Sequence, residues 1–318
     1  MTPRLKVLIM LSLATLCAPV FGANPARPGT LNYIEGSAYL EGEPLTQKAV
    51  GSTDLDRGQV LSTGQGKAEI LLTPGVFLRL DDNSSVKMIS PDLTFTQLGL
   101  ERGRATVEVD EIHPQNDLQI VEGGVSTQLL KTGLYEFNAN DDVAEVFSGK
   151  AATLEGEGKW VVIKGHHELA LNAIDPQKPQ GFNTHAAQDE LYNWSSLRSQ
   201  YLSESNAQLS QEYAGAFGFA PGWYWDPFFL DYTFMGPGPF ISPFGWGFSP
   251  FGYGGFGGGF YGRRGFYGGR GFAGGGFHGG GGGFHGGGGF HGGGGRYAGG
   301  GRYAGGYGGR YGGGGYGG

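Results

Sequence analysis

The stretch from Gly58 to Leu80, GQVLSTGQGKAEILLTPGVFLRL, predicts a β-hairpin. Between its arms, Pro74 pre-sets φ at the first turn position and Gly75 accepts the positive φ that a type II turn needs at the second. Apolar side chains alternate with other residues along both arms, at Ala68, Ile70, Leu72, Val76, Leu78 and Leu80. This alternation predicts one buried face and one face toward solvent.

Further strand-like segments lie on both sides of this hairpin, from about Leu31 to Lys164. They are four to seven residues long, recur at intervals near ten and are separated by turn residues. Because no helical period interrupts them, the pattern predicts an all-β sandwich or barrel.

Six short motifs follow one another in this region: Glu35 to Ala38, Gly58 to Thr63, Thr73 to Val76, Gly103 to Val109, Lys131 to Phe137, and Ala144 to Gly149. In this order they resemble the FecR domain, which occurs in bacterial envelope proteins and in iron-responsive anti-sigma regulators. The sequence departs from the family pattern where Pro74 replaces an acidic turn residue and where Thr132 and Gly133 stand in inverted order. The resemblance implies a jelly-roll-like, all-β fold for residues 23–175.

Residues 1–22 predict a cleaved export signal. Arg4 and Lys6 precede an apolar run of ten residues. Val20 and Gly22 are acceptable to a signal peptidase at the third and first positions before the cut, which places the cut between Gly22 and Ala23. No later stretch approaches the roughly 20 apolar residues of a transmembrane helix. We therefore expect an exported protein, in the periplasm or at the cell surface and beyond, with no transmembrane helix.

An alternative for this segment is a lipoprotein with Cys17 as the acylated residue, although Leu16 stands where a small residue is expected. Cys17 is the only cysteine, so we expect no disulfide and no thiolate metal site in the mature chain. The anti-sigma members of the FecR group add cytoplasmic helices and a transmembrane helix before the domain. Since only the signal precedes it here, we expect a stand-alone exported FecR-domain protein rather than an inner-membrane signalling protein.

The pattern changes to a helical period at residues 184–213. We expect one amphipathic helix, with Thr184 or Asp189 as its N-cap, that packs on the β-domain. Docking against a partner helix is the alternative. The apolar stripe of this helix would consist of Leu191, Trp194, Leu197 and Tyr201.

Residues 214–253 combine proline and glycine with aromatic residues, which predicts extended or turn-rich backbone with displayed rings rather than regular sheet. Residues 254–318 form a Gly/Arg/Tyr/His-rich tail, and 40 of the 66 glycines lie from Phe251 onward. Because glycine has no side chain to bury, we expect this tail to be disordered and the foldable part to end near Tyr232.

Charge divides the chain into an acidic middle and a basic end. Of the 22 Lys and Arg residues, two lie in the signal and six from Thr233 onward, which leaves 14 bases against all 29 acids, a net charge of −15. We expect a solvated acidic domain. The sharper hypothesis is that the tail, with its charge of +6, folds back on the domain or binds an external polyanion.

We find no catalytic constellation in the sequence and expect neither an enzyme nor a cofactor. The segment Ser148 to Lys150 lacks the first glycine of a phosphate-binding loop. No Ser/His/Asp set is identifiable. Acidic pairs stand in turn positions, where solvated carboxylates are the commoner arrangement: Asp81 and Asp82, Asp110 and Glu111, Asp141 and Asp142.

Histidines are the weak metal candidates: His166 and His167, and in the tail His278, His285 and His291. A glycine chain does not preorganise the roughly four ligands of a structural site, so we expect no dedicated metal site.

Arginine and tyrosine are the interaction candidates of the tail. Contacts between them are worth ~0.5–1 kcal/mol each when exposed, and valency multiplies them, which favours self-association. The candidates are Arg263, Arg264, Arg270, Tyr297, Arg302 and Tyr303. An Arg-Gly-Gly-like segment could also bind nucleic acid, but we do not expect an exported protein to meet it. An inert spacer is the alternative.

These observations lead to one main hypothesis and two alternatives. The main one is a non-enzymatic, exported envelope protein, a binding or scaffolding module whose tail adheres to envelope protein, polysaccharide or another copy. The first alternative is a periplasmic sensor or regulator that engages a signalling partner through the FecR-like domain. The second is metal capture by the tail histidines. The sequence names no small-molecule ligand.

Overall fold

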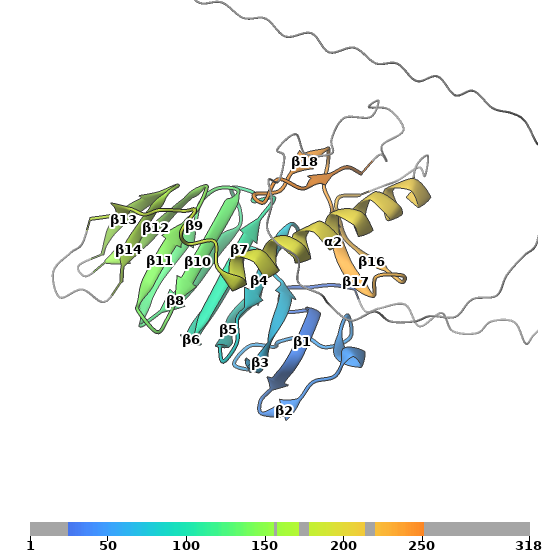
Figure 1. The fold of residues 1–318 in the computed structure, drawn as a ribbon, viewed down its shortest axis with the longest axis horizontal. Coiled ribbons are helices and arrows are strands. Elements are labelled where there is room, and N and C mark those ends of the chain that lie inside the picture. The colour runs from blue at the N-terminus through green and yellow to red at the C-terminus, as the bar shows by residue number, and fades with distance from the viewer. Residues whose placement is uncertain (1–24, 156–157, 172–177, 214–219, 251–318) are drawn as a thin grey trace, which may run out of the picture. The chain divides into compact units, whose positions relative to one another are not determined.

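The computed structural model describes residues 25–155, 158–171, 178–213 and 220–250. Within these ranges the protein is a β-sandwich with one α-helix, which confirms the all-β prediction (Figure 1). The expected signal and the expected tail lie outside the described residues. The strands of the main sheet are β1 (Leu31–Leu40), β2 (Glu43–Pro44), β3 (Val60–Leu71), β4 (Val76–Leu80), β5 (Ser85–Asp92), β6 (Phe95–Arg102), β7 (Arg104–Val109), β8 (Asp117–Glu122), β9 (Val125–Leu129), β10 (Gly133–Asn138), β11 (Val143–Val146), β12 (Lys150–Glu155), β13 (Lys159–Lys164), β14 (His167–Ala170) and β15 (Gln180–Gly181), with a 3-10 turn η1 (Gln47–Ala49) after β2.

Strand β3 joins the two layers of the sandwich. Its first residues, Val60–Ser62, pair with β5, whereas Ala68–Leu71 pair with β4. The first layer therefore runs β13-β12-β9-β8-β6-β5 and the second runs β4-β7-β10-β11-β14-β15. Strand β1 lies beside β3 and pairs with it antiparallel, and the register of the pair shifts near Gly66. A Cβ atom on Gly66 would lie 2.2 Å from the carbonyl oxygen of Glu35. Glycine permits this close approach of two backbones.

One apolar core lies between the two layers. Alternate side chains of both layers enter it, as period-2 strands require. The second layer contributes Val76, Leu78, Leu80, Val107, Tyr135, Phe137, Val146 and Leu169, and the first layer contributes Val86, Met88, Leu98, Leu100, Leu118, Ile120, Leu129 and Ile163.

The predicted hairpin is confirmed as β3 and β4. Gly75 has φ +82°, and the Val76 amide donates to the Thr73 carbonyl at 2.8 Å, as a type II turn requires. The prediction of a solvent face is wrong, because Phe77 and Arg79 are fully buried on the side that faces away from the core. Another layer covers that side.

This third layer consists of α2 (Glu190–Tyr213), the hairpin of β16 (Gly222–Asp226) and β17 (Asp231–Met235), and the short pair of β18 (Phe240–Ile241) and β19 (Gly247–Phe248). It packs on the outer face of the second layer through a second apolar cluster, made of Leu71, Phe77, Leu202, Tyr232, Phe234 and Phe248. The prediction of no regular sheet is therefore wrong for residues 222–248. The prediction of displayed rings is wrong for Tyr232, Phe234 and Phe248, which are buried, but is confirmed for Phe228, which is 74% exposed. The predicted end of the foldable part, Tyr232, lies inside β17.

The predicted helix is confirmed as α2, but it begins at Glu190 rather than near residue 184. Only the first half of the predicted apolar stripe is covered, since Leu191 is buried and Trp194 is half-buried. Asp189 is the N-cap, since its carboxylate accepts a hydrogen bond from the Tyr192 amide at 3.1 Å. Leu197 and Tyr201 of the predicted stripe are 47% and 42% exposed. The helix instead buries a mostly polar side: Leu191, Ser195, Arg198, Ser199, Leu202, Ser203, Ser205, Asn206, Leu209 and Ser210.

Charged side chains on the sheet explain this choice of side. We call Glu69, Arg79, Glu108, Arg198 and Asp231 the ionic cluster. Arg79 bonds Glu69 at 2.7 Å and Glu108 at 2.6 Å, and Arg198 bonds Glu69 at 3.1 Å and Asp231 at 3.0 Å. All five side chains are buried. Buried charges must be paired, so the helix side that carries Arg198 and hydroxyl groups packs here.

Candidate functional site

A single row of polar side chains crosses the outer face of the second layer. Each member stands directly opposite the next in the strand register, so all point to the same face. From β3 to β14 the row is Glu69, Arg79, Thr106, Glu136, Glu145 and Glu168. The first half lies under α2, where Arg79 belongs to the ionic cluster and the Thr106 hydroxyl bonds that of Ser195 at 2.9 Å. The second half, three consecutive glutamates, is the candidate site.

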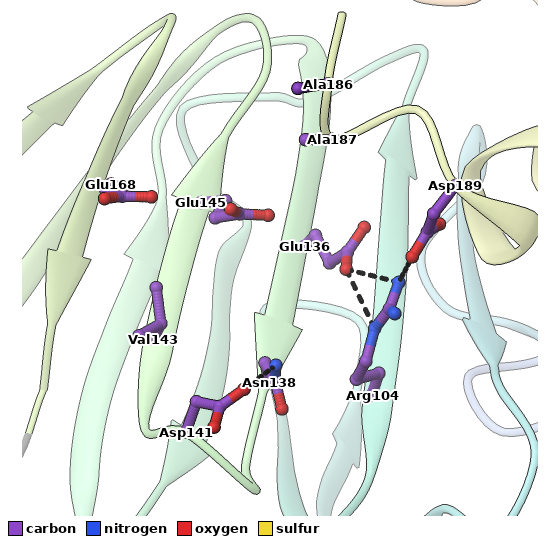
Figure 2. A pocket seen from close by; sticks show the side chains of 10 residues that line it. All are labelled: Arg104, Glu136, Asn138, Asp141, Val143, Glu145, Glu168, Ala186, Ala187 and Asp189. Carbon is purple, nitrogen blue, oxygen red and sulfur yellow. Dashed lines mark hydrogen bonds and ion pairs between the residues drawn. The ribbon is translucent and has the colours of Figure 1, made fainter. Parts of the chain in front are cut away.

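These glutamates line a pocket of about 300 Å³ beside the N-terminus of α2. Figure 2 shows Glu136, Glu145 and Glu168 on three neighbouring strands, with Ala186 and Ala187 above them. The charged side chains that line it are Arg104, Glu136, Asp141, Glu145, Glu168 and Asp189. The pocket thus holds five carboxyl groups and one guanidinium group.

Arg104 ties the pocket to the helix. Its guanidinium bonds Glu136 at 2.8 Å and also pairs with Asp189, as Figure 2 shows. Asp189 therefore caps α2 and holds Arg104 through the same carboxylate. This arrangement fixes one wall of the pocket to the sheet.

Glu136 is the buried end of the site. Its Oε1 atom accepts from Arg104, but its Oε2 atom is buried and has no hydrogen-bond partner. Burial raises the pKa of Glu136 to about 8, although Arg104 opposes the shift. A carboxyl group with this environment favours any ligand that brings a positive charge to Oε2.

Glu145 and Glu168 continue the row without a bonded partner, although the charge of Arg104 partly offsets the rise in the pKa of Glu145. Neither has an ion-pair or hydrogen-bond partner among the described residues. Burial, and then the negative charge of Glu168, raise the pKa of Glu145. Like charges placed directly opposite on adjacent strands destabilise a sheet. Ionised Glu145 and Glu168 therefore cost the fold free energy when no cation pairs with them.

The arrangement suits an elongated organic cation better than a metal ion. Neighbouring strands are ~4.8 Å apart, so the three carboxyl groups form a line rather than a cage. Within the described ranges, no group of three or more His, Cys, Asp or Glu side chains is placed to hold a metal ion. A guanidinium or ammonium group can bond carboxylates one after another along such a line.

The site residues predicted from the sequence are not in this pocket. The predicted cleavage site, the three tail histidines and the arginines and tyrosines of the tail all lie outside the described residues, so these stay predictions. Of the acidic pairs, Asp81 and Asp82 bond Lys67 at 3.2 and 2.9 Å. Asp141 lies at the pocket and accepts from the Asn138 amide at 2.7 Å.

Sequence reasoning missed Glu136, Glu145 and Glu168. Each occupies a position that alternates with core residues, such as Tyr135 and Phe137 around Glu136. That local signal places each glutamate on an outer face, but it says nothing of their alignment. Only the pairing of β10, β11 and β14 brings the three together.

Residues 59–152 match the sequence model of the family described as FecR protein. The chain thus contains a FecR domain, as the resemblance predicted. The match covers Glu136 and Glu145 of the site, whereas Glu168, Asp189 and the third layer lie beyond it.

Two crystal structures of a proposed anti-sigma factor from Parabacteroides distasonis ATCC 8503 are similar to this chain, at 12% and 13% identity and a TM-score of 0.35 each. The matches cover 41% and 43% of this chain and 62% and 64% of those chains, less than two thirds of their length. A comparison with curated proteins found no match.

Proposed function

We propose that this protein is a non-enzymatic regulator of the bacterial envelope that engages a partner protein through its FecR-containing sandwich. The observation that carries the proposal is the row of Glu136, Glu145 and Glu168, which lines a pocket and lacks sufficient positive charge of its own. The partner would supply that charge as a basic segment.

The family match supports a regulatory role. FecR domains occur in envelope proteins and in regulators that act by binding other proteins, and residues 59–152 form such a domain. In the part of the chain that the structure describes, no helix has the length and hydropathy to span a bilayer. Export to the periplasm or cell surface, expected from residues 1–22, would bring the domain to envelope partners.

The size and charge of the pocket favour a protein side chain as its occupant. At about 300 Å³ it lies at the lower end of the range for small-molecule sites. That space accommodates a long basic side chain, whose neighbours in a peptide would continue along the row. Charge-assisted bonds to carboxylates are the strong class of hydrogen bond.

A defined peptide tests this proposal. We expect a hexa-arginine peptide to bind the chain from Ala23, and the double variant Glu145→Gln/Glu168→Gln to weaken binding at least about tenfold in an isothermal titration. The matched control is Glu43→Gln/Glu101→Gln, which removes the same charge from two exposed positions away from the pocket. Equal losses of affinity in both variants would show that peptide binding depends only on the net charge of the protein, and the proposal would fail.

The pH dependence of binding gives a second readout. Glu136 is largely protonated below its pKa of about 8, so peptide affinity should rise from pH 7 to pH 9 as this carboxyl group ionises. Arginine keeps its charge throughout that range. In Glu136→Gln this rise should disappear, and a rise that persists would assign it to another group.

The adhesive or self-associating tail stays a separate hypothesis from the sequence. A chain that ends after Pro250 tests it, because this end keeps β17, β18 and β19 intact. If only the full chain sediments with the envelope of the host, the tail mediates retention. If both chains recover the same partner and the glutamate variant loses it, the pocket is the functional surface.

A further inference from the structure

The turn between β16 and β17 presents large apolar side chains to solvent. It consists of Pro227, Phe228, Phe229 and Leu230. Phe228 is 74% exposed and Leu230 is 61% exposed, the two highest values among the large apolar side chains of the described residues. Single exposed apolar side chains are common on protein surfaces, so the case for a function rests on two of them standing in one four-residue turn.

Buried contacts hold this turn in a fixed shape. The Asp226 carboxylate is fully buried and accepts hydrogen bonds from the Phe228 amide at 2.7 Å, the Phe229 amide at 3.2 Å and the Ser205 hydroxyl at 3.0 Å. The Leu230 amide donates to the Asp226 carbonyl at 2.8 Å. The exposed side chains of Phe228 and Leu230 therefore stand on a turn whose buried Asp226 is bonded to α2.

Leu230 occupies a backbone conformation that favours glycine. Its φ is +56°, a left-handed value that costs free energy for a bulky side chain. Glycine would fit the turn without this cost. The fold therefore does not require a leucine at this position.

The hairpin presents no charge around the turn. From Gly222 to Met235 the only charged residues are Asp226 and Asp231, and both are buried, with Asp231 bonded to Arg198. Aromatic rings stand next to the turn instead, since Trp225 packs edge-on against Tyr232, its partner in the strand register, with 5.1 Å between the ring centroids. Tyrosine and tryptophan rings favour the boundary between lipid headgroups and acyl chains.

We propose that the turn Pro227–Leu230 inserts into the headgroup region of a lipid bilayer and attaches the domain reversibly to a membrane surface. A protein partner is the poorer occupant for two reasons. Specific protein interfaces use about 20–30 residues on each side, far more than this four-residue tip. They also carry polar and charged groups around the apolar centre, whereas the charged residues between Gly222 and Met235 are both buried. A bilayer needs neither, and a few buried apolar side chains give weak, reversible attachment.

Vesicles of phosphatidylcholine alone test this inference, because they carry no net charge that could attract basic residues elsewhere in the chain. The chain from Ala23 to Gly318 should sediment with them, so that the apolar run of residues 1–22 does not contribute. The variant Phe228→Ser/Leu230→Ser should bind at least about tenfold more weakly. The control Leu197→Ser/Ile241→Ser removes two apolar side chains that are 47% and 60% exposed elsewhere, and should bind as the wild type does.

Leu230→Gly separates binding from folding. It relieves the left-handed strain, so the variant should resist urea at least as well as the wild type while its vesicle binding falls about threefold. Absence of wild-type binding, retention of binding in the double serine variant, or an equal loss in the control would each overturn the proposal. Recovery of a protein partner that depends on Phe228 without any vesicle binding would assign the turn to protein recognition instead.

Discussion

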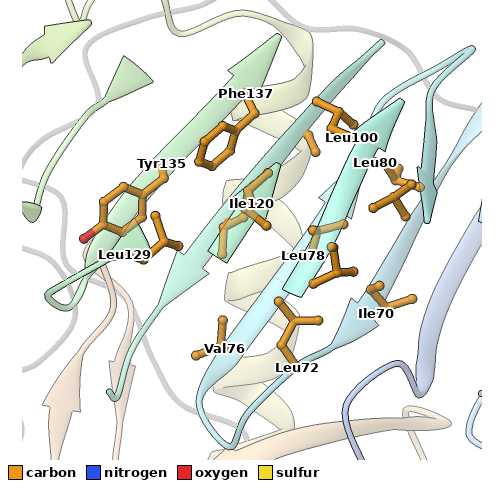
Figure 3. Packing of buried hydrophobic residues seen from close by; sticks show 14 of the residues in the cluster. Ile70, Leu72, Val76, Leu78, Leu80, Leu100, Ile120, Leu129, Tyr135 and Phe137 are labelled. Atoms are coloured by element: carbon orange, nitrogen blue, oxygen red, sulfur yellow. The ribbon is translucent and has the colours of Figure 1, made fainter. Parts of the chain in front are cut away.

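The two faces of the second layer are buried by different physics. The inner face carries Leu78 and its neighbours against the first layer, and Figure 3 shows these apolar side chains on one side of the strands with the helix on the other. The outer face carries Arg79 and Glu108, paired with each other and covered by α2. Leu78 and Arg79 are adjacent in sequence and both are almost completely buried.

The comparison shows that an apolar face and a charged face need different surfaces to cover them. Apolar burial is roughly proportional to area and has no direction, so any well-shaped apolar layer can cover the inner face. Burial of charges requires partners at bonding distance, so only a surface with Arg198 and hydroxyl groups can cover the outer face. The outer face therefore selects one side of α2.

The same contrast separates two buried glutamates. On the outer face, burial opposes ionisation of Glu69, but Arg198 and Arg79 lower its pKa overall. Glu122 comes two residues after Ile120 and four after Leu118 in β8, so its side chain lies on the same inner face, and it has no ion-pair partner among the described residues. Burial, and then the charge of Asp142, raise its pKa to about 8.

Removal of the central cation should give the largest effect. Arg79→Met leaves Glu69 and Glu108 buried without their partner and should lower the free energy of unfolding by about 3–5 kcal/mol at pH 8. Leu78→Ala, on the inner face, should cost about 2–5 kcal/mol through a cavity. Urea denaturation at several pH values distinguishes the two mechanisms.

The cost of Arg79→Met should shrink as pH falls, because protonation relieves the unpaired carboxylates, whereas the cost of Leu78→Ala should not change. The triple variant Glu69→Gln/Arg79→Met/Glu108→Gln should recover much of the loss. If Arg79→Met had the same cost at all pH values, the ionic account of the outer face would be wrong.

Glu122 should produce an effect that is spread over several pH units. Since its folded pKa of about 8 lies above its ordinary value of 4.5, its stabilising contribution is complete below pH 4.5 and is lost as pH rises to about 8. The loss approaches about 1.4 kcal/mol per pH unit within that window. Thermal or urea unfolding of Glu122→Gln should show a flatter pH profile than the wild type, and an unchanged profile would contradict this assignment.

Loss of one hydroxyl contact should give the smallest effect. The Ser199 hydroxyl donates to Glu108 at 2.7 Å in the buried interface between α2 and the sheet. Ser199→Ala should cost about 1.5–3 kcal/mol, the range for hydrogen bonds to charged groups. The control Ser196→Ala, a half-buried position of the same helix, should change stability by less than about 0.5 kcal/mol in the same urea titration.

Local sequence signals predicted the elements that depend on neighbouring residues. The turn at Pro74 and Gly75, the helix that begins after Asp189 and the strand alternation are confirmed. The side of α2 was predicted wrongly because its apolar stripe, including Leu197, was taken as the buried one. The aromatic segment after residue 220 was predicted wrongly because its strands are short and are stabilised by packing on Phe77 and Leu202.

The candidate site could not be predicted from the sequence, because it also depends on contacts between distant segments. A glutamate that alternates with core residues is ordinarily solvated, and nothing local distinguishes Glu145 from such a residue. Its neighbours in space, Glu136 and Glu168, become neighbours only through strand pairing. The exposure of Phe228 agrees with the displayed rings expected for residues 214–253, whereas the hairpin that carries the turn Pro227–Leu230 was not predicted.

The sequence by itself determined the hairpin turn and the strand periods, and it limited the N-cap of α2 to Thr184 or Asp189, because φ preferences, alternation and capping act among residues a few positions apart. Only the tertiary structure decided which polar side of α2 is buried, which carboxylates find a guanidinium partner and which remain in the pocket. Those outcomes depend on strand register and on contacts between distant segments. A charge is stabilised or penalised by what lies within a few ångströms of it, and the fold alone decides that.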